Sequence, residues 1–140
     1  MTQARELLCT LVDYENAARL RGLDLTTSRF RKLTASEREL LRAELIAEYI
    51  RLSVSSTGKA SERHEEIMAG FCEKICSLGL PSHELLGTYL AAIDVVVGDK
   101  RFAGLDWLVD AVRSTMPAAM KNCAELIKDR SQELGLARSI

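Results

Sequence analysis

Two cysteines and a histidine lie close together in the stretch FCEKICSLGLPSHELL, which covers residues 71–86. Cys72 and Cys76 are four residues apart, so a helix would place both thiols on one face, ahead of His83. Thiols and imidazoles are the ligands of zinc sites, but a tetrahedral site usually combines two such pairs, and the other two cysteines are isolated in the sequence. We therefore interpret the stretch as a hinge between two helices, without a metal or a cofactor.

The histidines give no catalytic constellation. His64 lies two helical turns before Cys72, too far away to share a ligand with it, and neither His64 nor His83 has a nucleophile or carboxylate at a spacing that defines a triad. The stretch SVSSTGKA lacks the leading glycine of a phosphate-binding loop and has Ala60 after its Gly-Lys pair. We predict no catalytic residues and no enzyme, and leave open whether Cys72, Cys76, His64 or His83 has any chemical role.

The composition is that of a single helical domain. The chain has 140 residues, of which 47% are hydrophobic and only 5% aromatic, with eight glycines and two prolines. So few turn residues argue against a β-sandwich, and a net charge of −1 argues against nucleic acid as a partner. Charged residues interrupt the first twenty positions, and no apolar run is long enough for a bilayer, which predicts a cytoplasmic protein without membrane contact.

Hydrophobic periodicity predicts an all-α bundle of about five helices in one domain, residues 1–140. Residues 1–35 form an N-terminal helix and loop, and residues 36–134 the bundle core. Ser36 and Glu39 form a capping box at the start of the second helix. Gly79 ends the third helix, and Pro81 suits the first turn of the fourth. The expected helices begin near residues 3, 37, 62, 82 and 104.

The last helix carries a heptad-like row of apolar residues, the predicted seam. Such spacing is typical of helices that pack at shallow angles. A continuous helix from Gly104 to Leu134 would be about 45 Å long, more than a small domain needs, so we expect homodimerisation across it. Pro117 predicts a kink or a restart in this helix. The seam residues chosen as interface are Leu105, Val109, Val112, Met116 and Ala119.

Trp107 lies off the seam, on the opposite side of the same helix from Leu105 and Val109. Aromatic residues are enriched at interface hot spots, so Trp107, with Phe102 nearby, is a candidate contact for a second copy or another partner. The alternative is that both residues cover the connection from the fourth helix.

The stretches FCEKICSLGLPSHELLGTYLAAI and FAGLDWLVDAV resemble the N-terminal regulatory domain of RsbU-type stress-response phosphatases and, more distantly, the C-terminal domain of the circadian protein KaiA. The likeness covers residues 38–130. It implies an all-α bundle that dimerises through long helices and binds a signalling partner of the kinase or phosphatase regulator class. Domains of this family often carry a histidine where this chain has Tyr89, which we take as a partner-binding residue with Trp107.

The leading hypothesis is a non-enzymatic, homodimeric regulatory module that acts in signal transduction. One alternative is a DNA-binding regulator that uses the third and fourth helices as a helix-turn-helix, although the fourth helix has no Lys or Arg for phosphates. The other is a sensor of a small molecule or cofactor inside the bundle, with Cys72 and His64 as suspects.

Overall fold

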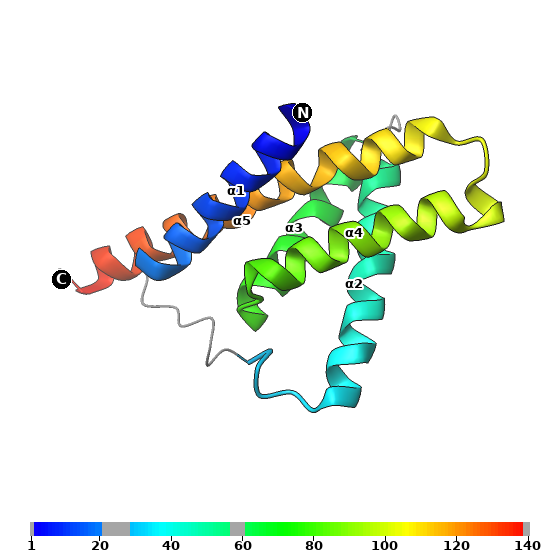
Figure 1. Cartoon of the computed structure of the whole chain (residues 1–140). Coiled ribbons are helices and arrows are strands. Elements are labelled where there is room, and N and C mark those ends of the chain that lie inside the picture. The colour runs from blue at the N-terminus through cyan, green and yellow to red at the C-terminus, as the bar shows by residue number, and fades with distance from the viewer. Residues whose placement is uncertain (1, 21–28, 57–60, 139–140) are drawn as a thin grey trace.

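A computed structural model describes residues 2–20, 29–56 and 61–138 of the chain (Figure 1). The described residues form five α-helices and one short 3₁₀ helix, with no strand among them, which confirms the all-α prediction. The helices are α1 (Thr2–Leu20), α2 (Ala35–Ser55), α3 (Ser61–Leu78), α4 (Ser82–Gly98), the 3₁₀ helix η1 (Lys100–Phe102) and α5 (Asp106–Arg138).

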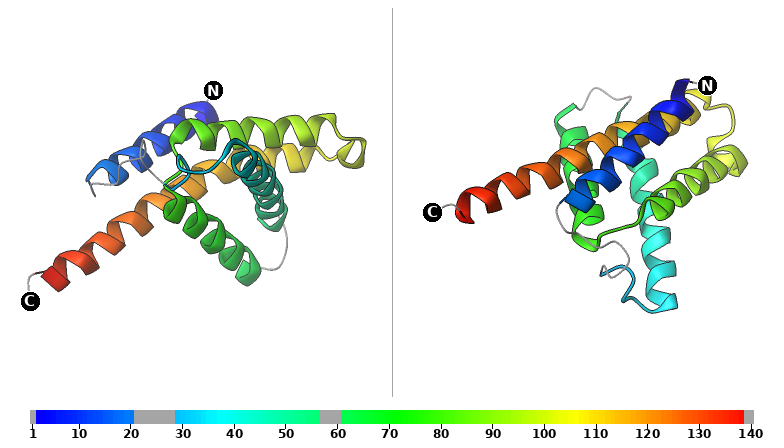
Figure 2. Two further views of the ribbon diagram at one scale, coloured as in Figure 1. Left: turned by 90° about the horizontal axis from the view of Figure 1, so that it is seen from below. Right: turned by 60° about the vertical axis from the view of Figure 1, so that its left-hand side comes forward.

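Helix α5 is the central element of the bundle, and each of the other four α-helices packs against it. Helix α3 lies on the opposite side of α5 from α1 and α4, and α2 lies across α4 and α5 and contacts both (Figure 2). Helix α1 follows α5 for much of its own length (Figure 1). The first and last helices of the chain are therefore neighbours.

One hydrophobic core joins all five helices. Leu7, Leu11 and Tyr14 of α1 belong to it, as does Phe30 from the loop before α2. This corrects the prediction that only residues 36–134 build the core. The sequence shows that α1 is amphipathic, but only the packing shows that its apolar face covers α5.

The start of α2 differs from the predicted one by two residues. Thr34 is the N-cap: its hydroxyl accepts from the amide of Glu37 at 3.2 Å, and the Glu37 carboxylate accepts from the amide of Thr34 at 3.1 Å. The capping box is thus Thr34–Glu37 and not Ser36–Glu39. The earlier box starts the helix two residues sooner, and it satisfies the free backbone amides of Thr34 and Glu37.

The turn between α3 and α4 lies where it was predicted, but Pro81 precedes the first turn of α4 and is not part of it. Gly79 adopts φ 64°, a left-handed conformation that costs glycine little and ends α3. Pro81 is the N-cap of α4, in extended backbone, and makes no side-chain capping bond. From α1, the hydroxyl of Tyr14 donates to the carbonyl of Leu80 at 2.7 Å, which fixes α1 to this turn.

Helix α5 is continuous through Pro117, so the predicted restart does not occur. Pro117 is buried and lies one turn after Arg113, whose carbonyl has no amide donor at position 117. Tertiary packing on both sides of α5 holds the helix together across this missing bond.

Candidate functional site

The middle of the predicted seam lies in the core of the monomer. Val112, Met116 and Ala119 have no exposed surface, because α1, α2 and α3 already pack around this part of α5. This corrects their assignment as interface residues: a second molecule has nothing to contact there. The buried surface of α5 is wider than the seam, which the sequence pattern did not indicate. Buried residues of α5 outside the seam include Leu108, Ala111, Thr115, Met120, Ala124 and Ile127.

The beginning of the seam is nearer the surface. Phe102, Leu105 and Val109 are half-buried and pack against the edge of the core. Trp107 is 46% exposed and remains a candidate contact residue. Tyr89, on α4, is half-buried and packs against the same core, so only part of its side chain is available to a partner.

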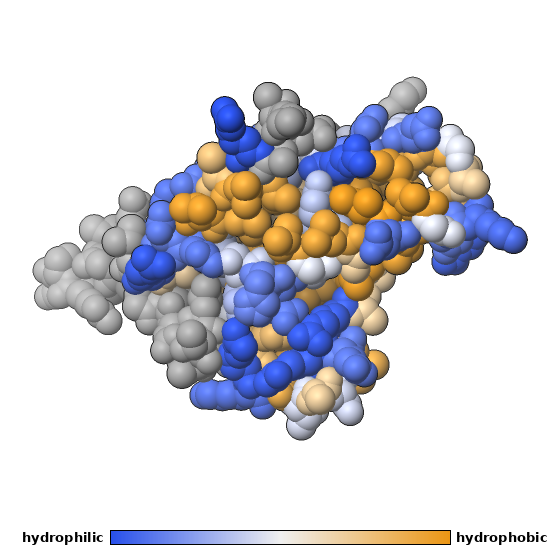
Figure 3. Space-filling view, in the orientation of Figure 1, coloured by the Kyte–Doolittle hydropathy of each residue, from blue (hydrophilic) through white to orange (hydrophobic). Residues whose placement is uncertain are grey.

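A second apolar surface, which the sequence pattern did not reveal, lies on α1 and α4. Leu8 and Val12 of α1 are more than half exposed, as are Leu90 and Val97 of α4. Figure 3 shows apolar side chains gathered in a band across this side of the molecule. We call these four residues the α1–α4 face. The composition of α4 could have revealed this face. The only charged or basic residues of α4 are His83, Glu84 and Asp94, so the helix is apolar on almost every side.

Packing brings three cysteines together that the sequence keeps apart. The Cys72 thiol lies 3.5 Å from the carbonyl oxygen of Ala119, and the Cys76 thiol lies 3.8 Å from that of Cys123. Contacts with the thiols of Cys72 and Cys76, together with burial, raise the pKa of Cys123. The Cys123 thiol therefore stays protonated, and the three cysteines fill a close crossing of α3 and α5 as small apolar groups.

The two histidines, the remaining candidates for metal or cofactor chemistry, lie in separate places in the structure. The Nδ1 atom of His64 lies 2.8 Å from the hydroxyl of Ser55, away from Cys72. His83 is exposed at the start of α4, and its Nε2 atom lies 3.9 Å from a carboxylate oxygen of Glu84. Within the described residues, no group of three or more His, Cys, Asp or Glu side chains is placed to hold a metal ion.

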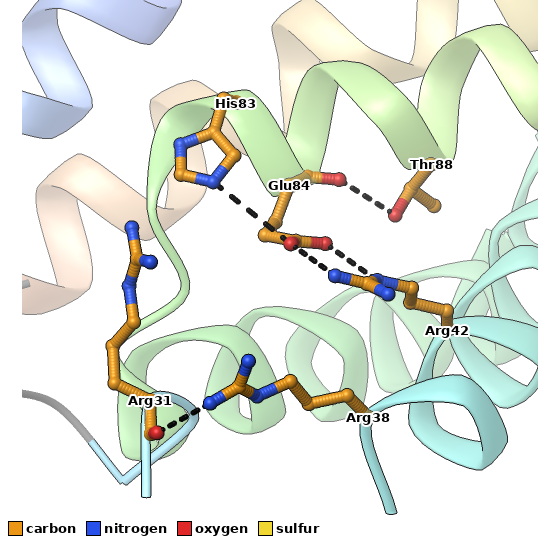
Figure 4. A network of polar contacts seen from close by, with 6 residues as sticks. All are labelled: Arg31, Arg38, Arg42, His83, Glu84 and Thr88. Atoms are coloured by element: carbon orange, nitrogen blue, oxygen red, sulfur yellow. Dashed lines mark hydrogen bonds and ion pairs between the residues drawn. The ribbon is translucent and has the colours of Figure 1, made fainter. Parts of the chain in front are cut away.

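Glu84 is the centre of a polar network between α2 and α4 (Figure 4). Arg42 donates to both of its carboxylate oxygens, from Nε at 3.0 Å and from Nη2 at 2.7 Å. This bidentate pair lowers the pKa of Glu84 and raises that of Arg42. Nearby, Nη2 of Arg38 donates to the carbonyl of Arg31 at 2.6 Å, and both Arg38 and Arg42 lie over the buried ring of Phe30. The network fixes the first turn of α4 on α2.

A shallow groove of about 260 Å³ lies between α2 and α3. It is lined by Glu48, Arg51, Ile67, Gly70, Phe71 and Lys74. Lys74 donates to Glu48 at 2.8 Å and to Glu44 at 3.2 Å, which raises the pKa of the ammonium group. The groove is open and its lysine is already paired, so we assign it no ligand.

No helix among the described residues combines the length and the apolar character that crossing a bilayer requires. Comparison of the chain with protein-family models, with curated proteins and with solved structures finds no match in any of the three.

Proposed function

We propose that this protein is a non-enzymatic, cytoplasmic regulatory module of signal transduction that homodimerises and binds a signalling protein. The observation that carries the proposal is the α1–α4 face: Leu8 and Val12 are exposed on α1, and Leu90 and Val97 are exposed on α4, which contacts α1. Exposed apolar side chains that gather on one side of a protein mark an interaction site, since each buried Leu or Val side chain contributes about 1.5–3 kcal/mol.

The buried polar groups support an interaction role over catalysis. Tyr14 and Tyr49 donate their hydroxyl protons to backbone carbonyls, and Ser53 donates to the carbonyl of Tyr49 at 2.9 Å. Burial raises the pKa of both tyrosines, so neither is poised to give up a proton near neutral pH. These three buried hydroxyl groups therefore hold the helices together through hydrogen bonds to backbone carbonyls.

The partner of the module is a kinase or phosphatase regulator in a stress-response pathway, as the resemblance to RsbU-type regulatory domains implies. Trp107 and the neighbouring Phe102 supply the contact surface at the end of the bundle where η1 leads into α5. An exposed Trp beside half-buried apolar residues is the arrangement that interface hot spots favour.

Light scattering over a range of protein concentrations tests homodimerisation. We expect a mass twice that of the 15.5 kDa chain. Leu90→Glu should shift the protein to the monomer, because a carboxylate would be buried at the centre of the face. Leu40→Glu is the matched control: Leu40 is 67% exposed on α2, outside the face, and its substitution should leave the mass unchanged. A wild-type protein that remains monomeric at high concentration would refute the dimer.

A further inference from the structure

The outermost line of α4 begins with four exposed residues of unequal character and continues to Val97, which is also exposed. His83, Gly87, Leu90 and Asp94 are all exposed and follow one another at steps of four, three and four residues. On a helix this spacing places them in one row, the α4 row, which points away from the core. The order along the row is basic, small, large, acidic.

When two copies of this row lie antiparallel, each of the four residues faces a residue of complementary size or charge. If a second α4 lies antiparallel on the first with its centre between Gly87 and Leu90, His83 faces the partner's Asp94, and Gly87 faces the partner's Leu90. The flanking residues obey the same register, since half-buried Leu86 faces the partner's Ala91. Each large side chain then meets a small one and each imidazole meets a carboxylate, twice per dimer, as an isologous interface requires.

Gly87 is the least expected residue of this row. It lies in the interior of α4, where glycine costs about 0.5–1 kcal/mol relative to alanine. A Cβ atom at position 87 would have no atom within 4 Å, so the packing of the monomer does not require a glycine there. The missing side chain leaves open space on the exposed side of α4, where a large side chain of a second molecule could approach the backbone.

We propose that two copies of this chain dimerise through α4, antiparallel, with the α4 row of one copy on that of the other; this rests on the homodimerisation proposed above. The imidazole of His83 donates a hydrogen bond to the partner's Asp94. Within the described residues Asp94 has no ion pair or hydrogen bond, and His83 has only its long contact with Glu84. Leu8 and Val12 are exposed on α1, which contacts α4, and are candidates to extend the apolar contact.

Two charge variants test the register. His83→Glu places a carboxylate against the partner's Asp94, and Asp94→Lys places an ammonium group against the partner's His83. Each variant alone should have a dimer dissociation constant roughly tenfold higher, because two contacts per dimer turn repulsive. When the two variants are mixed in equal amounts, native mass spectrometry should find a larger fraction of mixed dimers than random pairing gives. The reason is that all charge contacts in the mixed dimer are attractive.

Glu66→Lys, at an exposed position of α3, is the control and should not change the dissociation constant. Statistical mixing of the two charge variants would overturn the antiparallel register, and unchanged dimerisation of both variants would overturn the α4 interface.

A substitution at Gly87 gives a second, independent test of the α4 interface. Gly87→Leu should weaken dimerisation more than roughly tenfold by overfilling the contact, while leaving the melting temperature of the monomer unchanged or higher. Gly70→Leu is the matched control, since Gly70 is also exposed inside a helix and a Cβ atom added there would meet nothing within 4 Å, but it lies on α3. Dimerisation that tolerates Gly87→Leu as well as Gly70→Leu would overturn the proposal.

The failures of the two proposals are distinguishable. A wild-type chain that is monomeric at all concentrations defeats homodimerisation itself. A wild-type dimer that Leu90→Glu dissociates, but that neither His83→Glu, Asp94→Lys nor Gly87→Leu weakens, keeps the α1–α4 face and defeats the α4 row as its centre.

Discussion

The hydroxyl of Tyr49, on α2, donates a hydrogen bond to the backbone carbonyl of Val112, on α5. Tyr49 is completely buried, and its ring lies 5.9 Å from that of Phe71 on α3. The bond reaches α5 in the turn that precedes Pro117, where the helix lacks one backbone hydrogen bond. Helix α2 is thereby anchored to α5 where α5 is intrinsically weakest.

Tyr49→Phe keeps the ring and removes this bond. We expect the free energy of unfolding to fall by about 1 kcal/mol, with the helical content unchanged. Urea unfolding followed by circular dichroism measures the change. Tyr89→Phe is the control, because the Tyr89 hydroxyl makes no hydrogen bond in the described part of the chain; equal losses in the two variants would contradict the role of Tyr49.

The Arg42–Glu84 pair predicts an acid-sensitive contribution to stability. Arg42 holds the pKa of Glu84 below its ordinary value of 4.5. A carboxyl group with a lowered folded-state pKa stabilises the protein fully above its unfolded-state pKa, and this stabilisation is lost as the pH falls through the folded-state value.

Glu84→Gln should therefore cost up to about 1 kcal/mol at neutral pH, a modest amount because Arg42 is partly exposed, and less at pH 3, below the unfolded-state pKa of the carboxyl group. Unfolding measured at both pH values tests this. Glu65→Gln, at an exposed position of α3, should show no such pH dependence. A cost of Glu84→Gln that is equal at both pH values would exclude the pair as its cause.

The close crossing of α3 and α5 predicts that Cys72 tolerates no larger side chain. Cys72→Leu should destabilise the fold by about 1–3 kcal/mol, because Cys72 already lies against the backbone of α5 at Ala119. Cys9→Leu, at an exposed position of α1, should be nearly neutral. Thermal melts of the two variants test this prediction. Equal melting temperatures would mean that α3 and α5 can move apart without a loss of stability.

The same crossing predicts which thiols react. Cys9 is exposed, whereas Cys72 and Cys123 are buried and the pKa of Cys123 is raised. Iodoacetamide should modify Cys9 first in the native protein, and Cys72 and Cys123 only after unfolding. Peptide mass spectrometry over time measures the order. Rapid labelling of Cys123 in the native state would contradict the burial of this face of α5.

Trp107→Ala should leave the fold and its stability nearly intact, since this side chain is 46% exposed. If Trp107 contacts the signalling partner, proteins captured by the wild-type chain from its native cell extract should be lost with this variant. Circular dichroism supplies the control for folding. A Trp107→Ala protein that unfolds would place Trp107 in the core instead.

Gly70 and Gly79 should respond oppositely to alanine. Gly70 is inside α3 with open space around it, so Gly70→Ala should stabilise the fold by about 0.5–1 kcal/mol. Gly79 adopts φ 64°, so Gly79→Ala should destabilise it by about 1–2 kcal/mol. Melting temperatures that move in the same direction would contradict this interpretation of the turn.

Local signals in the sequence were sufficient for the helices and for the turn at Gly79 and Pro81. They were ambiguous at the start of α2, where Thr34–Glu37 and Ser36–Glu39 both have the spacing of a capping box, and only the structure distinguishes them. A capping box depends on residues three apart, so the sequence can propose it but not rank two overlapping copies.

Contacts between distant helices were not predictable in the same way. The thiol contacts of Cys72 and Cys76 with α5 both span 47 residues, a register that no periodicity within α3 or α5 encodes. For the same reason the seam residues Val112, Met116 and Ala119 resembled an uncovered interface. Periodicity identifies an apolar face of a helix, but it does not identify the helix that covers it.

The pairing of α1 with α5 has a consequence for biosynthesis. Helix α1 is translated before α5, the helix against which its apolar face, with Leu7, Leu11 and Tyr14, packs. A growing chain therefore exposes these apolar side chains until α5 has also left the ribosome. We expect a ribosome stalled before residue 106 to display α1 as a chaperone-binding segment, and synthesis of α5 to hide it.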